Sequence, residues 1–216
     1  MAVPTNYKEG DIRGVDVSHH QGVINWQKVS ASGVVYAYTK ATESIGFMDS
    51  RFATNFAGMK SNGILRGAYH FFRPKRDAKA QAENFIDVVK HVEPGDLPPA
   101  LDVEVDDGKT PGVIIKGVRT WLETVEQAFG RTPAIYTSAS FWNSKLGGTE
   151  EFGEHPLWVA HYTDKPKPAV PKGFATFDIW QFTDSGAGAV NGITSTKLDL
   201  NRFNGTMDQL RKLAGL

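Results

Sequence analysis

Residues 98–105, PPALDVEV, decide the fold prediction, because they combine a short apolar β-strand with two carboxylates on one face. Side chains alternate between the two faces of a strand. The apolar side chains at positions 101, 103 and 105 therefore share one face, and Ala100, Asp102 and Glu104 share the other. Two carboxylates on an otherwise apolar strand are costly to bury, so we expect them to face a cleft. An ordinary solvated strand end is the alternative for so short a motif.

Short β-rich runs alternate with helical runs on both sides of this stretch. Strands are expected over residues 12–18, 34–40, 65–72, 98–105, 133–137, 157–162, 177–182 and 196–200. Helices are expected over 49–61, 77–92, 111–129, 140–146 and 206–213, so no long helix separates the last three strands. This pattern predicts an α/β fold in a single domain over residues 1–216, with its core at about 11–205. The architecture would be a closed, mostly parallel TIM-like barrel, and an open doubly wound sheet is the alternative.

The composition excludes several classes of function. The 24 basic and 24 acidic residues cancel, whereas a nucleic-acid-binding protein normally has a strong basic excess. Cysteine is absent, which excludes disulfides, thiolate metal sites and cysteine nucleophiles. No apolar run approaches the roughly 20 residues of a membrane helix, and no signal peptide is visible at the N-terminus. We therefore expect no nucleic-acid partner and no membrane insertion, and the compartment stays open.

Two more acids are expected to join Asp102 and Glu104. Asp16 lies near the end of the first predicted strand, and Asp199 lies in the last one. Closing an eight-stranded barrel makes these two strands neighbours and places the fourth strand across the lumen. Active sites of such barrels lie at the carboxyl ends of the strands. Four acids around one cleft cannot all ionise freely, and Glu104 is our candidate for the group that retains a proton.

This set of acids suits glycoside hydrolysis, which needs a protonated carboxyl for the leaving oxygen and anionic groups beside the developing positive charge. Aromatic faces stack on sugars, although buried aromatic residues are more often simply core. Magnesium binding by the acids is an alternative, but no glycine-rich phosphate loop accompanies them. The histidines lack the spacing of a zinc site, so we expect neither a metal nor another cofactor. Four aromatic residues fall on predicted strands near the same cleft: Tyr69, Tyr136, Trp158 and Trp180.

Eight short motifs follow one another along the chain. They are Gly14-Val15-Asp16-Val17-Ser18 with Gln21-Gly22, Lys40-Ala41-Thr42-Glu43, Arg66-Gly67-Ala68-Tyr69-His70-Phe71, Leu101-Asp102-Val103-Glu104, Ile135-Tyr136-Thr137, Leu157-Trp158-Val159-Ala160, Trp180-Gln181-Phe182 and Asp199-Leu200-Asn201-Arg202-Phe203. In this order they resemble family 25 of the glycoside hydrolases, the Chalaropsis-type lysozymes. Each motif alone is weak, but the eight in order are highly specific, and they cover nearly the whole chain.

The resemblance implies a modified (β/α)5(β)3 barrel, in agreement with the helix-poor last third of the chain. It also implies a lysozyme, a muramidase that cleaves the β-1,4 bond between N-acetylmuramic acid and N-acetylglucosamine in bacterial peptidoglycan. By position, Glu104 would be the general acid, and Asp102 would orient the substrate's N-acetyl group in a substrate-assisted, retaining route. Asp16 and Asp199 would complete the catalytic set. The resemblance assigns substrate contacts to Tyr69, Tyr136, Trp158, Trp180 and Gln181.

Several points stay open after this comparison of motifs. Neighbouring-group help, an enzyme nucleophile and direct attack by water all fit the motifs. A catalytically inactive glycan-binding barrel and a metal-assisted hydrolase are the alternative functions. Ser44 stands where the family usually has glycine, and with the sequence ending at Leu216 we expect no appended cell-wall-binding module. A phage endolysin, a bacterial autolysin and a secreted enzyme fit equally well, and a monomer is expected.

Overall fold

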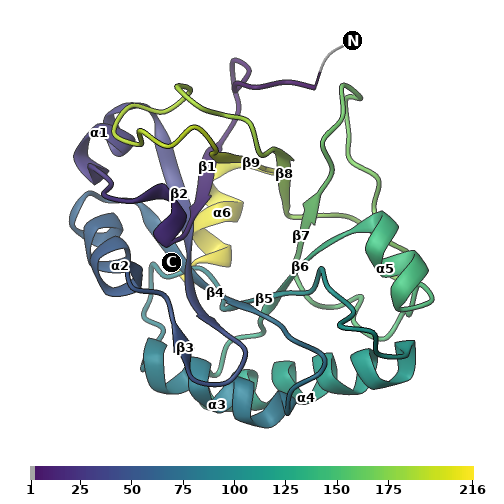
Figure 1. Ribbon diagram of the computed structural model, residues 1–216. Coiled ribbons are helices and arrows are strands. Elements are labelled where there is room, and N and C mark those ends of the chain that lie inside the picture. The colour runs from purple at the N-terminus through teal and green to yellow at the C-terminus, as the bar shows by residue number, and fades with distance from the viewer. Residues whose placement is uncertain (1–2) are drawn as a thin grey trace.

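A computed structural model describes residues 3–216, and eight of its strands close into a barrel (Figure 1). Around the ring the order is β1-β9-β8-β7-β6-β5-β4-β2, and pairing between β1 and β2 closes it. The predicted TIM-like α/β barrel is therefore confirmed, and the open sheet is excluded. The barrel strands are β1 (Arg13–Val17), β2 (Val34–Glu43), β4 (Leu65–Phe71), β5 (Ala100–Asp102), β6 (Ala134–Ser138), β7 (Leu157–Ala160), β8 (Ile179–Thr183) and β9 (Asp199–Phe203).

Helices α1 to α5 follow the first five barrel strands, one after each, and α6 follows the last strand, β9. In the described chain no helix lies between β7 and β9, so the arrangement is (β/α)5(β)3. A short 3-10 turn, His19–Gln21, precedes the first helix, and the two-residue strand β3 (Phe47–Met48) forms a hairpin with the end of β2. The helices are α1 (Trp26–Ala31), α2 (Phe52–Ser61), α3 (Ala78–Val89), α4 (Pro111–Phe129), α5 (Ala139–Lys145) and α6 (Met207–Leu213).

Local sequence signals account for the ends of the two longest helices. The Asp77 side chain caps α3 by accepting a hydrogen bond from the Ala80 backbone N–H at 2.8 Å, as expected for an N-cap aspartate. Pro111 occupies the first turn of α4, and Gly130 ends that helix in the left-handed region at φ 63°. Helix α1 was not predicted, because its six residues are too few to show a helical period.

The last strand runs against the others. Strand β9 is antiparallel to both β1 and β8, whereas the other neighbouring barrel strands pair in parallel. The strand expected over 196–200 in fact spans Asp199–Phe203. Because β9 starts at the end of the barrel where the parallel strands finish, its first residue, Asp199, pairs with Asp16 of β1.

The core has two layers, one inside the barrel and one between the strands and the helices. Leu101 and Val103 point outward to the helix layer, as predicted from the alternation along β5. Inside, two tyrosine rings fill the lumen where glycines leave room for them. A Cβ atom on Gly14 would lie 2.1 Å from the Tyr36 ring, so only glycine allows this packing. The same holds for Gly67 and the ring of Tyr38, at 2.2 Å.

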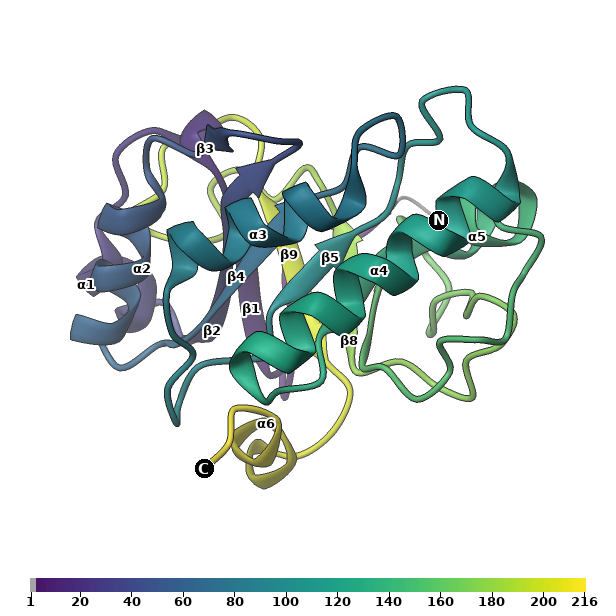
Figure 2. The ribbon, with the colours of Figure 1, turned by 90° about the horizontal axis from the view of Figure 1, so that it is seen from below.

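Helix α6 covers one end of the barrel, and the β3 hairpin projects at the other (Figure 2). Leu210 of α6 is fully buried against the inner layer of the core. Helices α3 and α4 pack side by side along the outside of the barrel (Figure 2). Within residues 3–216, no helix combines the length and the apolar character needed to cross a membrane.

Candidate active site

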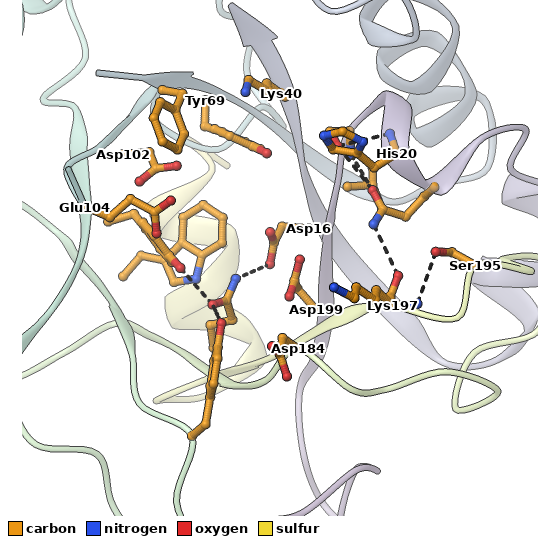
Figure 3. Close-up of a pocket in the computed structure, with 18 of the residues that line it drawn as sticks. Asp16, His20, Lys40, Tyr69, Asp102, Glu104, Asp184, Ser195, Lys197 and Asp199 are labelled. Carbon is orange, nitrogen blue, oxygen red and sulfur yellow. Dashed lines mark hydrogen bonds between the residues drawn. The ribbon is translucent and has the colours of Figure 1, made fainter. Parts of the chain in front are cut away.

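A pocket of about 630 Å³ opens at the carboxyl ends of the parallel strands, away from α6 (Figure 3). Its walls carry five carboxyl groups, the four predicted acids and Asp184, together with several aromatic rings. Eight of the nine residues that the sequence analysis assigned to the site line this pocket: Asp16, Tyr69, Asp102, Glu104, Tyr136, Trp158, Gln181 and Asp199.

The four acids form two groups that face one another. Asp16 of β1 and Asp199 of β9 are cross-strand partners and lie next to each other (Figure 3). Asp102 ends β5, and Glu104 follows it in the next stretch of chain, on the other side of the pocket (Figure 3). The predicted strand 98–105 is thus shorter than expected, but the extended backbone continues, because the Val103 N–H donates to the Tyr136 carbonyl at 2.9 Å. The alternation that directs both acids inward is therefore kept.

Asp16 is held by two neutral amides. Its Oδ2 atom accepts hydrogen bonds from Gln181 Nε2 at 2.9 Å and from Asn201 Nδ2 at 2.8 Å. Asn201 is in turn fixed by Trp158, whose Nε1–H donates to the Asn201 Oδ1 atom at 2.7 Å. Trp158 therefore does more than form a wall of the pocket, because it orients a partner of Asp16.

Two tyrosines fix the orientation of Gln181. The hydroxyls of Tyr136 and Tyr162 both donate to Gln181 Oε1, at 2.8 Å and 2.7 Å. This leaves the amide N–H₂ group of Gln181 pointing at Asp16. Gln181 was expected to contact substrate; it lines the pocket but is only 3% exposed, with its amide oxygen bound to two tyrosines and its amide nitrogen to Asp16. Its evident role in the structure is to hold Asp16 in place.

All four carboxyls have raised pKa values, and the first cause in each case is the loss of surrounding water. Burial raises the pKa of Asp16 to about 6, and burial together with the nearby Asp16 charge raises that of Asp199 to about 9. Burial, and then the charge of Glu104, holds the pKa of Asp102 well above its ordinary value. Partial burial, and then the negative charge of Asp16, raise the pKa of Glu104. The Glu104 side chain nevertheless remains exposed at the opening of the cleft. Protons in the cleft are therefore shared among several carboxyls rather than confined to Glu104.

Asp102 has an unusual environment for a carboxylate. The residue is only 6% exposed, and its Oδ1 atom has no hydrogen-bond partner within the described part of the chain. Buried polar atoms are nearly always hydrogen-bonded. This unpaired oxygen is itself buried, so Asp102 lines the pocket with the rest of its side chain.

A buried cation balances part of this negative charge. Lys40 lines the pocket, and its ammonium lies 2.6 Å from Glu43 Oε2. Its charge acts against burial by lowering the pKa values of Asp102 and Glu104. Glu43 also faces Arg73 at 3.9 Å, and Arg73 pairs with Asp107 at 2.7 Å. This chain of ion pairs ties the end of β2 to the loop that carries Glu104.

Trp180 is the one predicted site residue that lies outside the cleft. Neighbouring residues on a strand point to opposite faces, and Gln181 takes the inward direction. Trp180 therefore packs in the outer layer, where its Nε1–H donates to the His161 carbonyl at 2.8 Å and the Arg202 guanidinium lies 5.4 Å from its ring. The expected contact between Trp180 and substrate is corrected by this placement.

The sequence analysis also missed residues that line the pocket. Lys40 stands on the same face of β2 as Tyr38, so the period of that strand could have identified it. Tyr162 follows β7 with the parity of Trp158 and could have been found in the same way. Asp184 and Lys197 come from the long loop between β8 and β9, where no period exists to guide a prediction. Among residues 3–216, no group of three or more His, Asp or Glu side chains is arranged to hold a metal ion.

A closed barrel with acids and aromatic rings at the carboxyl ends of its strands defines the class of barrel glycosidases. Comparison with known sequences agrees with this class. The model of the family "Glycosyl hydrolases family 25" matches residues 15–192. The chain belongs to this family, as its motifs had indicated.

Individual relatives support the assignment over nearly the full chain. Lysozyme M1 of Streptomyces globisporus is 38% identical over 213 residues, which cover 94% of this chain and 71% of that protein. The N,O-diacetylmuramidase of a Chalaropsis species is 30% identical, with 94% of this chain and 99% of the relative covered. The crystal structure of a bacterial lysozyme from Streptomyces coelicolor superposes with a TM-score of 0.89 at 35% identity, covering 96% of this chain and 98% of the other.

Proposed function

We propose that this protein is a 1,4-β-N-acetylmuramidase, a lysozyme that hydrolyses the bond between N-acetylmuramic acid and N-acetylglucosamine in peptidoglycan. The observation that carries the proposal is the convergence of Asp16, Asp102, Glu104 and Asp199 on one pocket of a family 25 barrel. All four acids that the proposed reaction uses lie on one chain, so the proposed site needs no second copy of the protein.

Glu104 is proposed as the general acid. It is the most exposed of the four carboxyls, so it can reach the glycosidic oxygen of a bound glycan. Partial burial and then the negative charge of Asp16 raise the pKa of Glu104, which favours the protonated form that a general acid requires. Asp16 and Asp199, on the opposite side, would stabilise the positive charge that develops on the sugar.

Asp102 is proposed to act on the N-acetyl group of the substrate. An acetamido N–H would donate a hydrogen bond to the carboxyl group of Asp102, which lines the pocket. This bond would turn the acetamido carbonyl oxygen toward the anomeric carbon. That oxygen would then attack while the glycosidic bond breaks and Glu104 protonates the leaving oxygen. Glu104, now a carboxylate, would remove a proton from the water that opens the cyclic intermediate, with net retention of configuration.

The cleft walls are proposed to position the sugar. Tyr69, Tyr136 and Trp158 line the pocket on the side of Asp102 and Glu104. Their rings contact one another, with the Trp158 ring 6.2 Å from that of Tyr69 and 4.7 Å from that of Tyr136. Such mutual packing keeps the rings rigid, which reduces the entropy lost when a sugar stacks on them. A catalytically inactive binding barrel is not favoured, because the full acid set is present.

The test is digestion of purified peptidoglycan, with new reducing ends identified by mass spectrometry. The wild type should release muramic-acid reducing ends, and Glu104→Gln should lower the rate by about 10²-fold or more with an unchanged fold by circular dichroism. Glu83→Gln, a surface carboxylate on α3, is the matched control and should keep full activity. Activity should also survive EDTA. A wild type that binds peptidoglycan but releases no reducing ends would establish the binding barrel instead.

A further inference from the structure

The hairpin formed by β2 and β3 carries apolar side chains that are exposed to solvent. Phe47 is 42% exposed, Met48 is 58% exposed, and Ile45 at the turn is 48% exposed. The turn has two residues in the left-handed region, Ser44 at φ 53° and Gly46 at φ 80°. Several large apolar side chains grouped on one short projection suggest a contact surface rather than chance exposure.

This hairpin is anchored on both sides. The Asp49 N–H donates to the Ala41 carbonyl at 2.9 Å. From α3, the Asn84 side chain donates to the carbonyls of Ser44 and Phe47 at 3.4 Å and 3.3 Å. The position of Phe47 is therefore fixed before any ligand arrives, which lowers the entropy lost on binding.

Phe47 lies directly beside the pocket. The Lys40 ammonium is 4.7 Å from the ring of Phe71 and 5.6 Å from the ring of Phe47, and both Lys40 and Phe71 line the pocket. On its other side, the Phe47 ring lies 6.2 Å from the ring of His19, which contacts the ring of His20 at 4.0 Å with the two planes tilted by 41°. His20 also lines the pocket, and Figure 3 shows it with Lys40 on the side away from Asp184. Phe47, His19 and Phe71 thus form an aromatic platform at the edge of the pocket, which Lys40 and His20 connect to its lining.

The chemistry of this platform suits a neutral sugar. Aromatic rings stack on the C–H faces of sugar rings and on acetyl methyl groups. The ammonium beneath Phe47 is already paired with Glu43 at 2.6 Å, so it offers no free charge for an anionic group. A peptide stem with free carboxylates would find little to bind here, whereas an uncharged N-acetyl sugar would.

We propose that Phe47, with His19 and Phe71 beside it, forms a distal binding site for an N-acetylhexosamine of the same glycan strand whose bond is cut in the cleft. This inference rests on the proposed muramidase function and adds a preference for long glycan strands. Met48 provides an internal comparison, because it adjoins Phe47 in β3 and so points to the opposite face of the hairpin.

The test compares two substrates, a tetrasaccharide and peptide-free glycans of about ten sugars. The longer glycans are chosen so that one strand can occupy the cleft and the site at Phe47 together. Phe47→Ala should lower the ratio of kcat/KM for the long glycan to that for the tetrasaccharide by about 3- to 10-fold. The loss should lie in KM, because ring stacking acts equally on ground and transition states. Phe47→Trp should restore the ratio, Phe47→Leu should not, and Met48→Ala should leave it unchanged.

Three results would overturn the inference: an unchanged ratio in Phe47→Ala, an equal loss in Met48→Ala, or full rescue by leucine. Calorimetric binding of the same two glycans to Glu104→Gln, with and without Phe47→Ala, separates this inference from the catalytic proposal. A selective loss of affinity for the long glycan supports the distal site whichever residues carry out cleavage. Equal affinity for both glycans in the two proteins refutes it, even if the muramidase activity is confirmed.

Discussion

Asp16→Asn should make the protein more stable at neutral pH while it destroys activity. Asp16 is 6% exposed, and both groups that hydrogen-bond to it, the amides of Gln181 and Asn201, are uncharged. Its ionised form therefore lacks water without gaining a direct cationic partner. Asparagine has nearly the same shape, and its carbonyl oxygen can accept the same two amide hydrogen bonds.

The size and sign of the effect follow from the pKa of Asp16. Burial raises this pKa from 3.8 to about 6, so the folded state binds the proton more tightly than the unfolded state does. The stabilisation is present in full below about pH 4 and is lost as the pH rises through about 6. A difference of about two pKa units corresponds to at most about 3 kcal/mol of unfolding free energy. For a chain of this size, that is about 6–12 °C in Tm.

The assay is urea unfolding followed by tryptophan fluorescence between about pH 4 and pH 8. The unfolding free energies of Asp16→Asn and the wild type should coincide near pH 4, diverge up to about pH 6 and then differ by a constant amount. Asp87→Asn, an exposed carboxylate on α3, should show no such divergence. An equal gap at both ends of the pH range, or a variant less stable than the wild type near pH 8, would refute the reasoning. Peptidoglycan hydrolysis by Asp16→Asn should fall by about 10²-fold or more.

Two further predictions concern residues on either side of the barrel wall. Burial lowers the pKa of His70, which stacks on Trp121, to about 3. At pH values under about 6.5 the unfolding free energy should therefore decrease by up to about 1.4 kcal/mol for each pH unit. In urea unfolding, His70→Gln should lack this dependence on pH. Trp158→Phe should reduce peptidoglycan hydrolysis about tenfold, because Asn201 loses its 2.7 Å donor. Trp180→Phe should stay within about twofold of the wild type, because Trp180 packs on the outer face of the barrel against Arg202 and the His161 carbonyl. Equal losses in the two tryptophan variants would contradict the placement of these rings.

Much of the barrel could be predicted because its strands obey a simple alternation. In β5 the outward Leu101 and the inward Asp102 follow from a period of two, and the same rule places Asp16 correctly. The prediction was wrong where the rule was not applied consistently. Trp180 and Gln181 are neighbours on β8, so they cannot both face the cleft.

Other features depend on the tertiary structure and leave no local signal. The antiparallel direction of β9 is set by its pairing with β1 and β8, and these partners also fix the bounds Asp199–Phe203 in place of the expected 196–200. The ion pairs that connect Lys40 through Glu43 to Arg73 join residues from different strands and loops. The free oxygen of Asp102 is a property of its surroundings alone. None of these features has a periodicity that a single sequence could display.

The reversed direction of β9 has a practical consequence for immobilising the enzyme. Because β9 begins beside the cleft and runs away from it, the chain reaches α6 and Leu216 at the opposite end of the barrel (Figure 2). Leu216 is 60% exposed. A linker attached there to a bead or an electrode would hold each molecule with the opening of its active-site cleft facing the solution. An insoluble wall fragment could then approach the cleft without meeting the support.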